Sequence, residues 1–151
     1  MNLTERKNLL ENYRNGFSLL KHAINQFPKD GLNFKPASNK WSVHEIVIHL
    51  ADSDVQSHVR CRTILADPGS TIMNCNEYEW SVALNYSEQD FEEALSIISI
   101  IRSANFKFLQ KVSEESWKNA CIHSVRGKFS LEDWLETYSN HIPKHIAQIG
   151  R

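Results

Sequence analysis

The sequence predicts an all-α fold, a four-helix bundle that forms one domain over residues 1–151. Two observations predict it. Apolar side chains recur every three or four residues in four separate segments, and this spacing places them on one face of an α-helix. No segment shows a convincing strand pattern. Four amphipathic helices without strands bury their apolar faces by packing against one another.

The first helix is expected to end at Pro28. Gly16 lowers its helix propensity slightly, and Pro28 closes it because proline cannot continue the backbone hydrogen bonding. Residues 28–40 contain two prolines and a glycine, so we expect a loop there. The apolar face of this helix consists of Leu9, Tyr13, Phe17, Leu20, Ile24 and Phe27.

The second helix has a clear start. Ser42 and Glu45 form an S-x-x-E capping box, in which each side chain satisfies a backbone N–H of the other residue. The helix is expected to run to about Ala66, before the sequence DPGS interrupts it. Its apolar face consists of Val43, Ile46, Val47, Leu50, Ile64 and Leu65.

A long, irregular connection from Asp67 to Tyr86 follows. Such connections in compact domains are usually functional or contain short helices. The third helix is expected to begin at Ser87, with Asp90 as the third residue of a weaker capping box. It is expected to turn six apolar residues inward: Phe91, Leu95, Ile98, Ile101, Phe108 and Val112.

Residues 114–130 are expected to form a second connection, with a tight turn at Gly127. The fourth helix is expected to begin at Ser130. Its apolar face consists of Leu131, Trp134, Leu135, Tyr138, Ile142 and Ile149.

Charge and cysteine content exclude several classes of protein. The chain has 17 basic and 18 acidic residues without a long run of either sign, so no basic stripe for nucleic acid is visible. The N-terminal segment is charged and amphipathic, unlike a signal peptide or a membrane span. Three cysteines without C-x-x-C spacing are typical of free thiols in a reducing compartment. We therefore expect a cytoplasmic protein without nucleic-acid or membrane partners.

Four of the seven histidines are expected to be ordinary surface or loop residues. His22 lies opposite the apolar face of its helix, at 100° per residue. His44 and His58 point away from the side of the second helix that carries His49. His123 lies in the second connection, where helical spacing cannot place it.

His141 and His145 are different, because they continue the apolar stripe of the fourth helix. Buried imidazoles are unfavourable unless their nitrogens are satisfied. Side chains four residues apart project from one face of a helix and can bind one metal ion. H-x-x-x-H alone is a weak pattern, however, and hydrogen-bonded core histidines are the alternative interpretation.

His49 lies at the edge of the apolar face of the second helix. It is next to a polar row that suits the wall of a cleft between helices. Together with His141 and His145 it would form a three-histidine metal site with an open position, where a bound water can be activated. The polar row consists of Ser42, Glu45, Ser53, Gln56 and Arg60.

Three segments resemble the DinB/YfiT-like family. WSVHEIVIHLADSD resembles the second helix of that family, and FSLEDWLETYSNHIPKHIAQI resembles its last helix with the H-x-x-x-H pattern. The EYEW…Y…F stretch between them also fits, so the resemblance covers nearly the whole chain. The resemblance implies a four-helix bundle with a divalent metal held by a histidine triad, here His49, His141 and His145.

The resemblance also implies a function. Relatives include S-transferases that use bacillithiol-type thiols, maleylpyruvate isomerases and metal-dependent hydrolases, and homodimers are common. We expect an enzyme that uses Zn²⁺ or Ni²⁺ to transfer a low-molecular-weight thiol to a small electrophile. A hydrolase with a metal-activated water is one alternative, and a non-catalytic metal-binding module in stress responses is another.

Several residues have two interpretations. Glu45 is expected to orient His49 or act as a base, or only to cap its helix. Arg60 is expected to pair with an anionic group of the substrate, or to be an exposed arginine without such a role. Trp80 and Tyr86 are candidates for the roof of the cleft. Pro143 is expected to kink the fourth helix between the two histidines, because it cannot donate a hydrogen bond to the residue 139 carbonyl.

Overall fold

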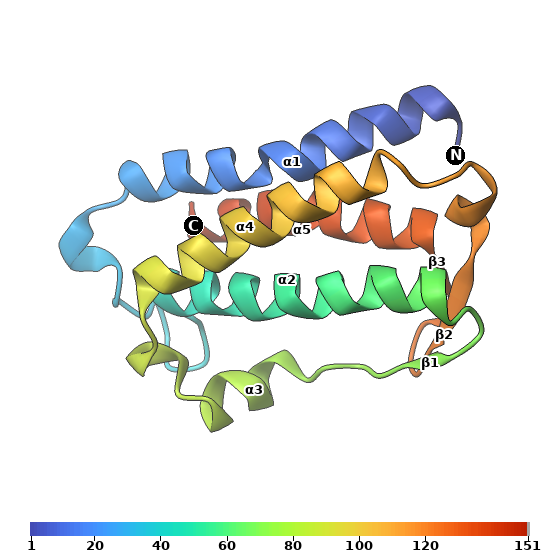
Figure 1. The fold of residues 1–151 in the computed structure, drawn as a ribbon. Helices are drawn as coiled ribbons and strands as arrows, with labels where there is room; N and C mark the ends of the chain where they lie inside the picture. Colours follow the sequence, from blue (N-terminus) through green and yellow to red (C-terminus); the bar gives the residue numbers. More distant parts are fainter. Residues whose placement is uncertain (151) are drawn as a thin grey trace.

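The computed structural model describes residues 1–150 and confirms the all-α fold (Figure 1). Helices α1 and α5 run in the same direction, opposite to α2 and α4. No helix among residues 1–150 is long and apolar enough to span a membrane. The helices are α1 (Leu3–Asn25), α2 (Val43–Ala66), α3 (Glu77–Ala83), α4 (Phe91–Leu109) and α5 (Leu131–Ile149), with three 3₁₀ turns, η1 (Lys29–Gly31), η2 (Tyr86–Glu88) and η3 (Glu115–Lys118).

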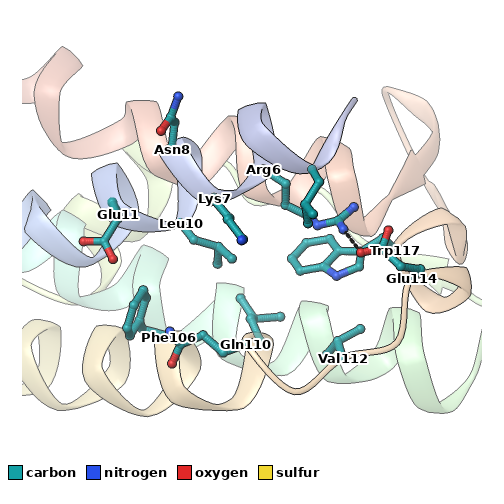
Figure 2. Close-up of a pocket in the computed structure, with 12 residues that line it drawn as sticks. Arg6, Lys7, Asn8, Leu10, Glu11, Phe106, Gln110, Val112, Glu114 and Trp117 are labelled. Atoms are coloured by element: carbon teal, nitrogen blue, oxygen red, sulfur yellow. Dashed lines mark hydrogen bonds and ion pairs between the residues drawn. The ribbon is translucent and has the colours of Figure 1, made fainter.

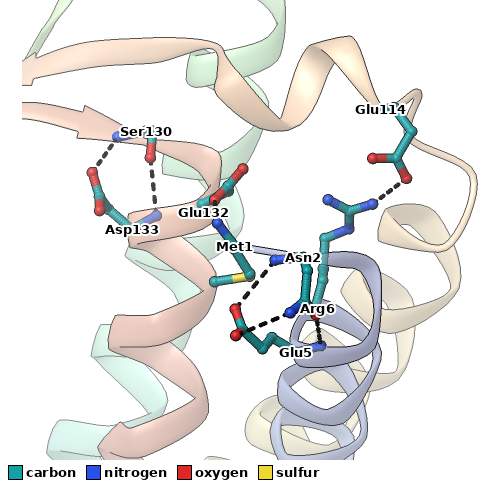
Figure 3. Close-up of polar contacts among 8 residues, drawn as sticks. All are labelled: Met1, Asn2, Glu5, Arg6, Glu114, Ser130, Glu132 and Asp133. Atoms are coloured by element: carbon teal, nitrogen blue, oxygen red, sulfur yellow. Dashed lines mark hydrogen bonds and ion pairs between the residues drawn. The ribbon is translucent and has the colours of Figure 1, made fainter.

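Capping boxes set the starts of three long helices. Ser42 caps α2 and Ser130 caps α5, as the sequence predicts. The Ser130 hydroxyl accepts the Asp133 backbone N–H at 3.1 Å, and the Asp133 carboxylate accepts the Ser130 N–H at 2.9 Å. Figure 3 shows this pair of bonds beside the equivalent box at the start of α1, formed by Asn2 and Glu5. Each box satisfies backbone donors that a helix end leaves free.

The predicted start of the third long helix was wrong by a few residues. Asp90 is the cap itself, because its carboxylate accepts the Glu93 backbone N–H at 2.9 Å. Ser87 belongs instead to the separate turn η2. The helix ends at Leu109, so Val112 lies beyond it, and Phe108 is 36% exposed with the Arg62 guanidinium stacked on its ring.

A small three-stranded sheet was not predicted. It consists of β1 (Thr71–Ile72), β2 (Ala120–His123) and β3 (Gly127–Ser130), with β1 parallel and β3 antiparallel to β2. Strands of two and four residues are too short to show a period-2 pattern in the sequence. The tight turn at Gly127 is confirmed by its positive φ of 78°. The sheet lies at the end of the bundle where α5 begins (Figure 1).

The core consists of two apolar clusters. One surrounds Trp117, Trp134 and Phe129 near the sheet, and the other surrounds Leu50 and Ile98 toward the opposite end of the bundle. Both clusters contain fully buried side chains from several helices, so the long helices pack around both of them.

A buried ion pair also joins α2 to α4. Arg102 donates to both carboxylate oxygens of Asp54, at 2.9 and 3.1 Å, and to the Tyr13 carbonyl at 3.0 Å. Gly16 makes room for it, because a Cβ at that position would lie 3.0 Å from Arg102 Nη1. The glycine that weakens α1 in the sequence therefore accommodates the arginine.

Two ion pairs connect the start of α1 to α5 and to the segment before η3. The Met1 amino group lies 3.3 Å from a Glu132 carboxylate oxygen, and Arg6 pairs with Glu114 (Figure 3). The Arg6 guanidinium also lies over the Trp117 ring, 5.0 Å from its centroid. Arg6, Glu114 and Trp117 border an open depression of about 430 Å³ between α1 and α4 (Figure 2). It is separate from the histidine cluster.

Candidate metal centre

The fold brings together the three histidines singled out in the sequence. His49 lies in the second turn of α2, while His141 and His145 lie in the second half of α5. One ligand nitrogen from each lies within 4.8 Å of the others. The Nε2 atoms of His49 and His141 are 3.4 Å apart. Among residues 1–150, this is the only group of three such side chains that could hold a metal ion.

Pro143 does not separate the pair on α5. The helix continues through it from Leu131 to Ile149, and the proline itself is exposed to solvent. The ring centroids of His141 and His145 are 4.8 Å apart. The proline ring is thus on the solvent side, and the lost hydrogen bond to residue 139 leaves the two imidazoles on one face.

Burial keeps the imidazoles neutral. It lowers the pKa of His49 to about 3, with repulsion from His145 as the smaller cause. It likewise lowers the pKa of His141 to about 2, reinforced by His145 and His49. The pKa of His145 is lowered by burial as well, against the opposing effect of Gln148 and Glu77. A neutral imidazole has the free lone pair that metal coordination requires.

Neighbouring side chains orient these rings. The Gln148 side-chain oxygen lies 2.8 Å from His145 Nδ1, so Nδ1 carries the proton and Nε2 keeps a lone pair. The Trp41 ring packs against His49 and His145, with centroid distances of 4.8 and 6.5 Å. In the described chain, His141 Nδ1 is the one buried side-chain nitrogen or oxygen without a hydrogen-bond partner. Three neutral imidazoles with one nitrogen each within 4.8 Å of the others fit a divalent cation.

The histidines open onto a polar cleft of about 270 Å³. Its walls carry both acidic and basic side chains, and they come from α2, α3, the sheet and α5. The other cleft residues are Asp52, Ser53, Gln56, Arg60, Asn74, Cys75, Glu77, Tyr86, His123, Arg126, Thr137, Tyr138 and Lys144. Three members of the predicted polar row of the second helix, Ser53, Gln56 and Arg60, therefore line this cleft.

The two catalytic candidates lie in different places. Arg60 is in the cleft wall and donates to the Tyr138 hydroxyl at 3.0 Å and to the Met73 carbonyl at 2.6 Å. Glu45 is buried in its capping box, with its carboxylate 3.1 Å from the Ser42 nitrogen and 3.6 Å from Lys35 Nζ. The structure thus gives Glu45 the capping role, while a role of its carboxylate toward His49 stays a prediction.

Of the two aromatic candidates, only Tyr86 lines the cleft. Its hydroxyl donates to the Asp52 carboxylate at 2.7 Å. Trp80 is not among the residues that line the cleft: it is 38% exposed and lines a neighbouring depression, which shares Gln56 and Arg60 with the cleft. Trp80 lies on the short helix α3, whose orientation the sequence of an irregular connection could not indicate.

The same helix places Glu77 at the histidines, which the sequence analysis missed. Its carboxylate oxygen lies 3.9 Å from His49 Nε2, and its side chain is 57% exposed. Asn76 caps α3 by accepting the Glu79 backbone N–H at 3.0 Å, which fixes where Glu77 lies on the helix. A carboxylate at this place can accept a proton from a group bound beside His49.

The other four histidines lie outside the cluster. His22 is exposed, as expected. His44 Nε2 lies 2.7 Å from the Gln89 carbonyl, and His58 Nδ1 lies 2.9 Å from Asn105 Oδ1. The expectation of a surface or loop position was wrong for His123, which is only 5% exposed in strand β2 and lines the cleft. Helical periodicity could not locate it because it lies in the sheet.

All three cysteines are free thiols. Cys61 and Cys121 are buried in the apolar cluster near the sheet, where burial raises the pKa of Cys61 to about 11. Cys75 lines the cleft and accepts a hydrogen bond from Gln56 Nε2 at 3.3 Å. No cysteine belongs to the histidine group.

Sequence comparison identifies relatives along nearly the whole chain. The sequence model of the DinB superfamily matches residues 13–149. A protein of Oceanobacillus iheyensis, named a "putative metal-dependent hydrolase", is 24% identical over 131 residues, covering 87% of this chain and 76% of that protein. YfiT of Bacillus subtilis has the same name and is 25% identical over 131 residues, covering 86% of this chain and 74% of YfiT.

Solved structures share the fold. The structure of YfiT from Bacillus subtilis superposes with a TM-score of 0.91 at 22% identity, covering 99% of this chain and 86% of YfiT. A mycothiol-dependent maleylpyruvate isomerase superposes with a TM-score of 0.76 at 12% identity, covering 99% of this chain and 61% of the isomerase. The arrangement of helices seen in Figure 1 is therefore shared with YfiT, whose structure is described as a four-helix bundle of unusual topology.

Proposed function

This chain belongs to the DinB superfamily, and from that membership we propose that it is a metal-dependent enzyme whose divalent ion is held by His49, His141 and His145. The observation that carries the proposal is the convergence of three ligand nitrogens within 4.8 Å. Three protein ligands leave a coordination position free, as catalytic rather than structural zinc sites do. Zn²⁺ or Ni²⁺ suits a site made of imidazole nitrogens.

For the reaction, we propose transfer of a low-molecular-weight thiol to a small electrophile. When bound, a divalent ion lowers the pKa of a thiol or water molecule in its open position. Glu77 is placed to accept the released proton, since its carboxylate is 3.9 Å from His49 Nε2 and reaches solvent. Arg60 faces the same cleft and can hold an anionic group of the substrate. The mycothiol-dependent isomerase with the same fold supports thiol chemistry.

Hydrolysis by a water activated at the same site is the second candidate. It is favoured by the hydrolase names of the relatives in Bacillus and Oceanobacillus. The polar cleft beside the histidines suits this reaction as well, because Glu77 would deprotonate the water in the way proposed for the thiol. A metal-binding module without catalysis, acting in stress responses, remains a third interpretation.

Metal analysis of purified protein tests the proposed site. We expect about one divalent ion per chain in the wild type and in His22→Ala, whose side chain is exposed. His49→Ala and His141→Ala should each lose most of the ion, because only two ligands remain. Folded variants that retain a full complement of metal would overturn the triad.

Product analysis then separates the reactions. Metal-loaded protein is incubated with bacillithiol, mycothiol, cysteine or coenzyme A and the electrophile monochlorobimane, and in parallel with ester and amide substrates. Thiol conjugation above the rate of the His141→Ala variant supports the transferase. Ester or amide cleavage without conjugation supports the hydrolase, and neither activity leaves the metal-binding module.

The family resemblance also predicts a homodimer and a cytoplasmic location. Light scattering coupled to size-exclusion chromatography measures the mass of the protein in solution and so tests the homodimer. We expect a mass of about twice the 17.5 kDa of one chain. A mass of one chain at all concentrations would contradict it.

A further inference from the structure

His123 is held in one tautomer by the hairpin that carries it. Its Nδ1 accepts the backbone N–H groups of Val125 at 3.1 Å and Arg126 at 3.0 Å. A nitrogen that accepts two hydrogen bonds carries no proton, so the neutral ring has its proton on Nε2. Protonating Nδ1 would break both bonds in the turn between β2 and β3. His123 is therefore a fixed hydrogen-bond donor.

The donor nitrogen faces the cleft. His123 lines the cleft next to His49 and His141, and its Nε2 makes no hydrogen bond with any described residue. Among residues 1–150, His141 Nδ1 is the only fully buried side-chain nitrogen or oxygen without a hydrogen-bond partner. His123 Nε2 also has no partner, so it is not fully buried. Nε2 must therefore retain contact with solvent, and the cleft is the described pocket that His123 lines.

Two guanidinium groups share the cleft with this donor. Arg60 and Arg126 both line the cleft and both contribute, after burial, to lowering the pKa of His123. Arg60 uses two of its N–H groups, for Tyr138 and Met73, and Arg126 uses one, for Thr137 at 3.2 Å. Each guanidinium has five N–H donors, so both keep free donors for a ligand.

The charge balance of the cleft favours an anion. Arg60, Arg126 and Lys144 are its cationic side chains, and Asp52 and Glu77 are its carboxylates. Asp52 accepts the Tyr86 hydroxyl, and Glu77 lies at His49. The free donors are thus concentrated at His123 and the two arginines, and a guanidinium fork matches a carboxylate geometrically.

We propose that His123 Nε2, Arg60 and Arg126 form a binding site for a carboxylate group of the substrate. A small carboxylic acid would be anchored there, with its reactive end directed to the histidines in the same cleft. This role for the ligand as substrate rests on the proposed function, whereas the carboxylate site itself does not need a metal. The β2–β3 hairpin supplies two of the three side chains and so determines specificity.

The tautomer is tested directly by NMR of protein labelled with ¹⁵N-histidine. Long-range proton–nitrogen correlations distinguish Nε2–H from Nδ1–H. We expect His123 as the Nε2–H form at pH 7, in both metal-loaded and chelator-treated protein. An Nδ1–H form would overturn the proposal.

Two isosteric variants test the donor. In His123→Asn the side-chain oxygen can replace Nδ1 toward the turn, but nothing reaches the position of Nε2. In His123→Gln the terminal amide reaches that position and restores a donor. With succinate as the probe, we expect His123→Asn to bind about tenfold more weakly than wild type, as for one lost hydrogen bond to a charged acceptor. His123→Gln restores the donor but not the acceptor of the turn amides, so it should bind succinate more tightly than His123→Asn.

The contribution of Arg126 is tested in the same titration with succinate. Arg126→Gln should weaken succinate binding by about tenfold, because a charge-assisted contact is lost. Arg14→Gln, an exposed arginine of α1, is the matched control and should have no effect. The neutral analogue succinamide should not compete with succinate.

Protein as purified and protein stripped of metal are both titrated. Succinate binding that survives stripping supports the carboxylate site even if the metal analysis contradicts the proposed enzyme. Binding that disappears with the metal, or equal binding by wild type, His123→Asn and Arg126→Gln, would overturn the site and leave the metal triad untouched. If His123→Asn fails to fold, Arg126→Gln and the tautomer measurement still decide.

Discussion

At the scale of single residues, the hydrogen-bond partners of the histidines determine which nitrogen is available. Gln148 fixes the tautomer of His145 from one turn further along α5. The turn amides of the hairpin do the same for His123. The free nitrogen of His145 therefore offers a lone pair, whereas the free nitrogen of His123 carries a proton. The two rings are therefore prepared for opposite partners, a cation and an anion.

Gln148 should support metal affinity without being a ligand. We expect Gln148→Ala to bind the metal about 10- to 100-fold more weakly, as is typical when a partner of a ligating histidine is lost. Gln148→Glu keeps an acceptor for His145 Nδ1 and should retain the affinity. Competition with a chromophoric chelator measures both, and equal affinity of the alanine variant and wild type would contradict this role.

The metal-free protein should lose stability in acid. The pKa values of His49 and His141 are about 3 and about 2 in the folded chain, below the ordinary value of 6.5. The unfolded chain therefore takes up protons first as the pH falls below about 6.5. Each of these histidines should then lower the free energy of unfolding by up to about 1.4 kcal/mol per pH unit.

Urea unfolding of chelator-treated protein at pH 7, 6 and 5 measures this slope. His141→Gln has one titrating ring fewer and should show a shallower decline. A stability that stays constant from pH 7 to 5 in the metal-free wild type would contradict the burial of neutral imidazoles.

At the scale of elements, α5 begins with a capping box and contains an internal proline. Ser130 and Asp133 satisfy its first backbone donors, and Pro143 interrupts its ladder on the solvent side. Boundaries of this kind were predictable because capping side chains are local signals. The rest of the element depends on packing against α1, its parallel neighbour in Figure 1.

Replacing the proline should stabilise the helix. Pro143→Ala restores the N–H donor toward the Ser139 carbonyl, and we expect a gain of about 1–3 kcal/mol in the free energy of unfolding. Because Pro143 is exposed, the metal content should not change. A variant that is more stable but has lost its metal would show that Pro143 is needed to orient His145 toward the metal ion.

Periodicity and capping predicted the four long helices, because both are encoded locally. The apolar stripe singled out His141 and His145, and the resemblance to the DinB/YfiT-like family indicated that His49 would join them. The sequence could not locate Glu77, Cys75 or His123 at the cleft. Glu77 lies on a seven-residue helix, too short for a periodic pattern. His123 depends on a four-residue strand whose pairing with β1 joins segments about fifty residues apart. Such long-range pairing has no local signature.

At the scale of the whole molecule, the Asp54–Arg102 pair connects α2, α4 and the backbone of α1. Both side chains are almost fully buried, so neither can be satisfied by water if the other is removed. The pair is thus a specific contact within an otherwise apolar bundle. It is predicted to hold the relative positions of three helices.

Removing one partner of the Asp54–Arg102 pair should lower the free energy of unfolding. We expect Asp54→Ala to lower the free energy of unfolding by about 3–5 kcal/mol, since the Arg102 charge is left buried and unpaired. The exposed pair of Glu11 and Arg14 provides the control, and Glu11→Ala should cost less than about 1 kcal/mol. Equal effects of the two substitutions in chemical denaturation would contradict the structural role of the buried pair.

The packing of Trp41 against His49 and His145 makes the indole an optical reporter for the cleft. Among the four tryptophans, Trp117 and Trp134 are buried in the other apolar cluster, and Trp80 lines the depression that adjoins the cleft. Paramagnetic Ni²⁺ should quench the emission of Trp41, whereas Zn²⁺ should shift it with little quenching. Fluorescence difference spectra between wild type and Trp41→Phe would then follow ion exchange at the histidines without any added dye.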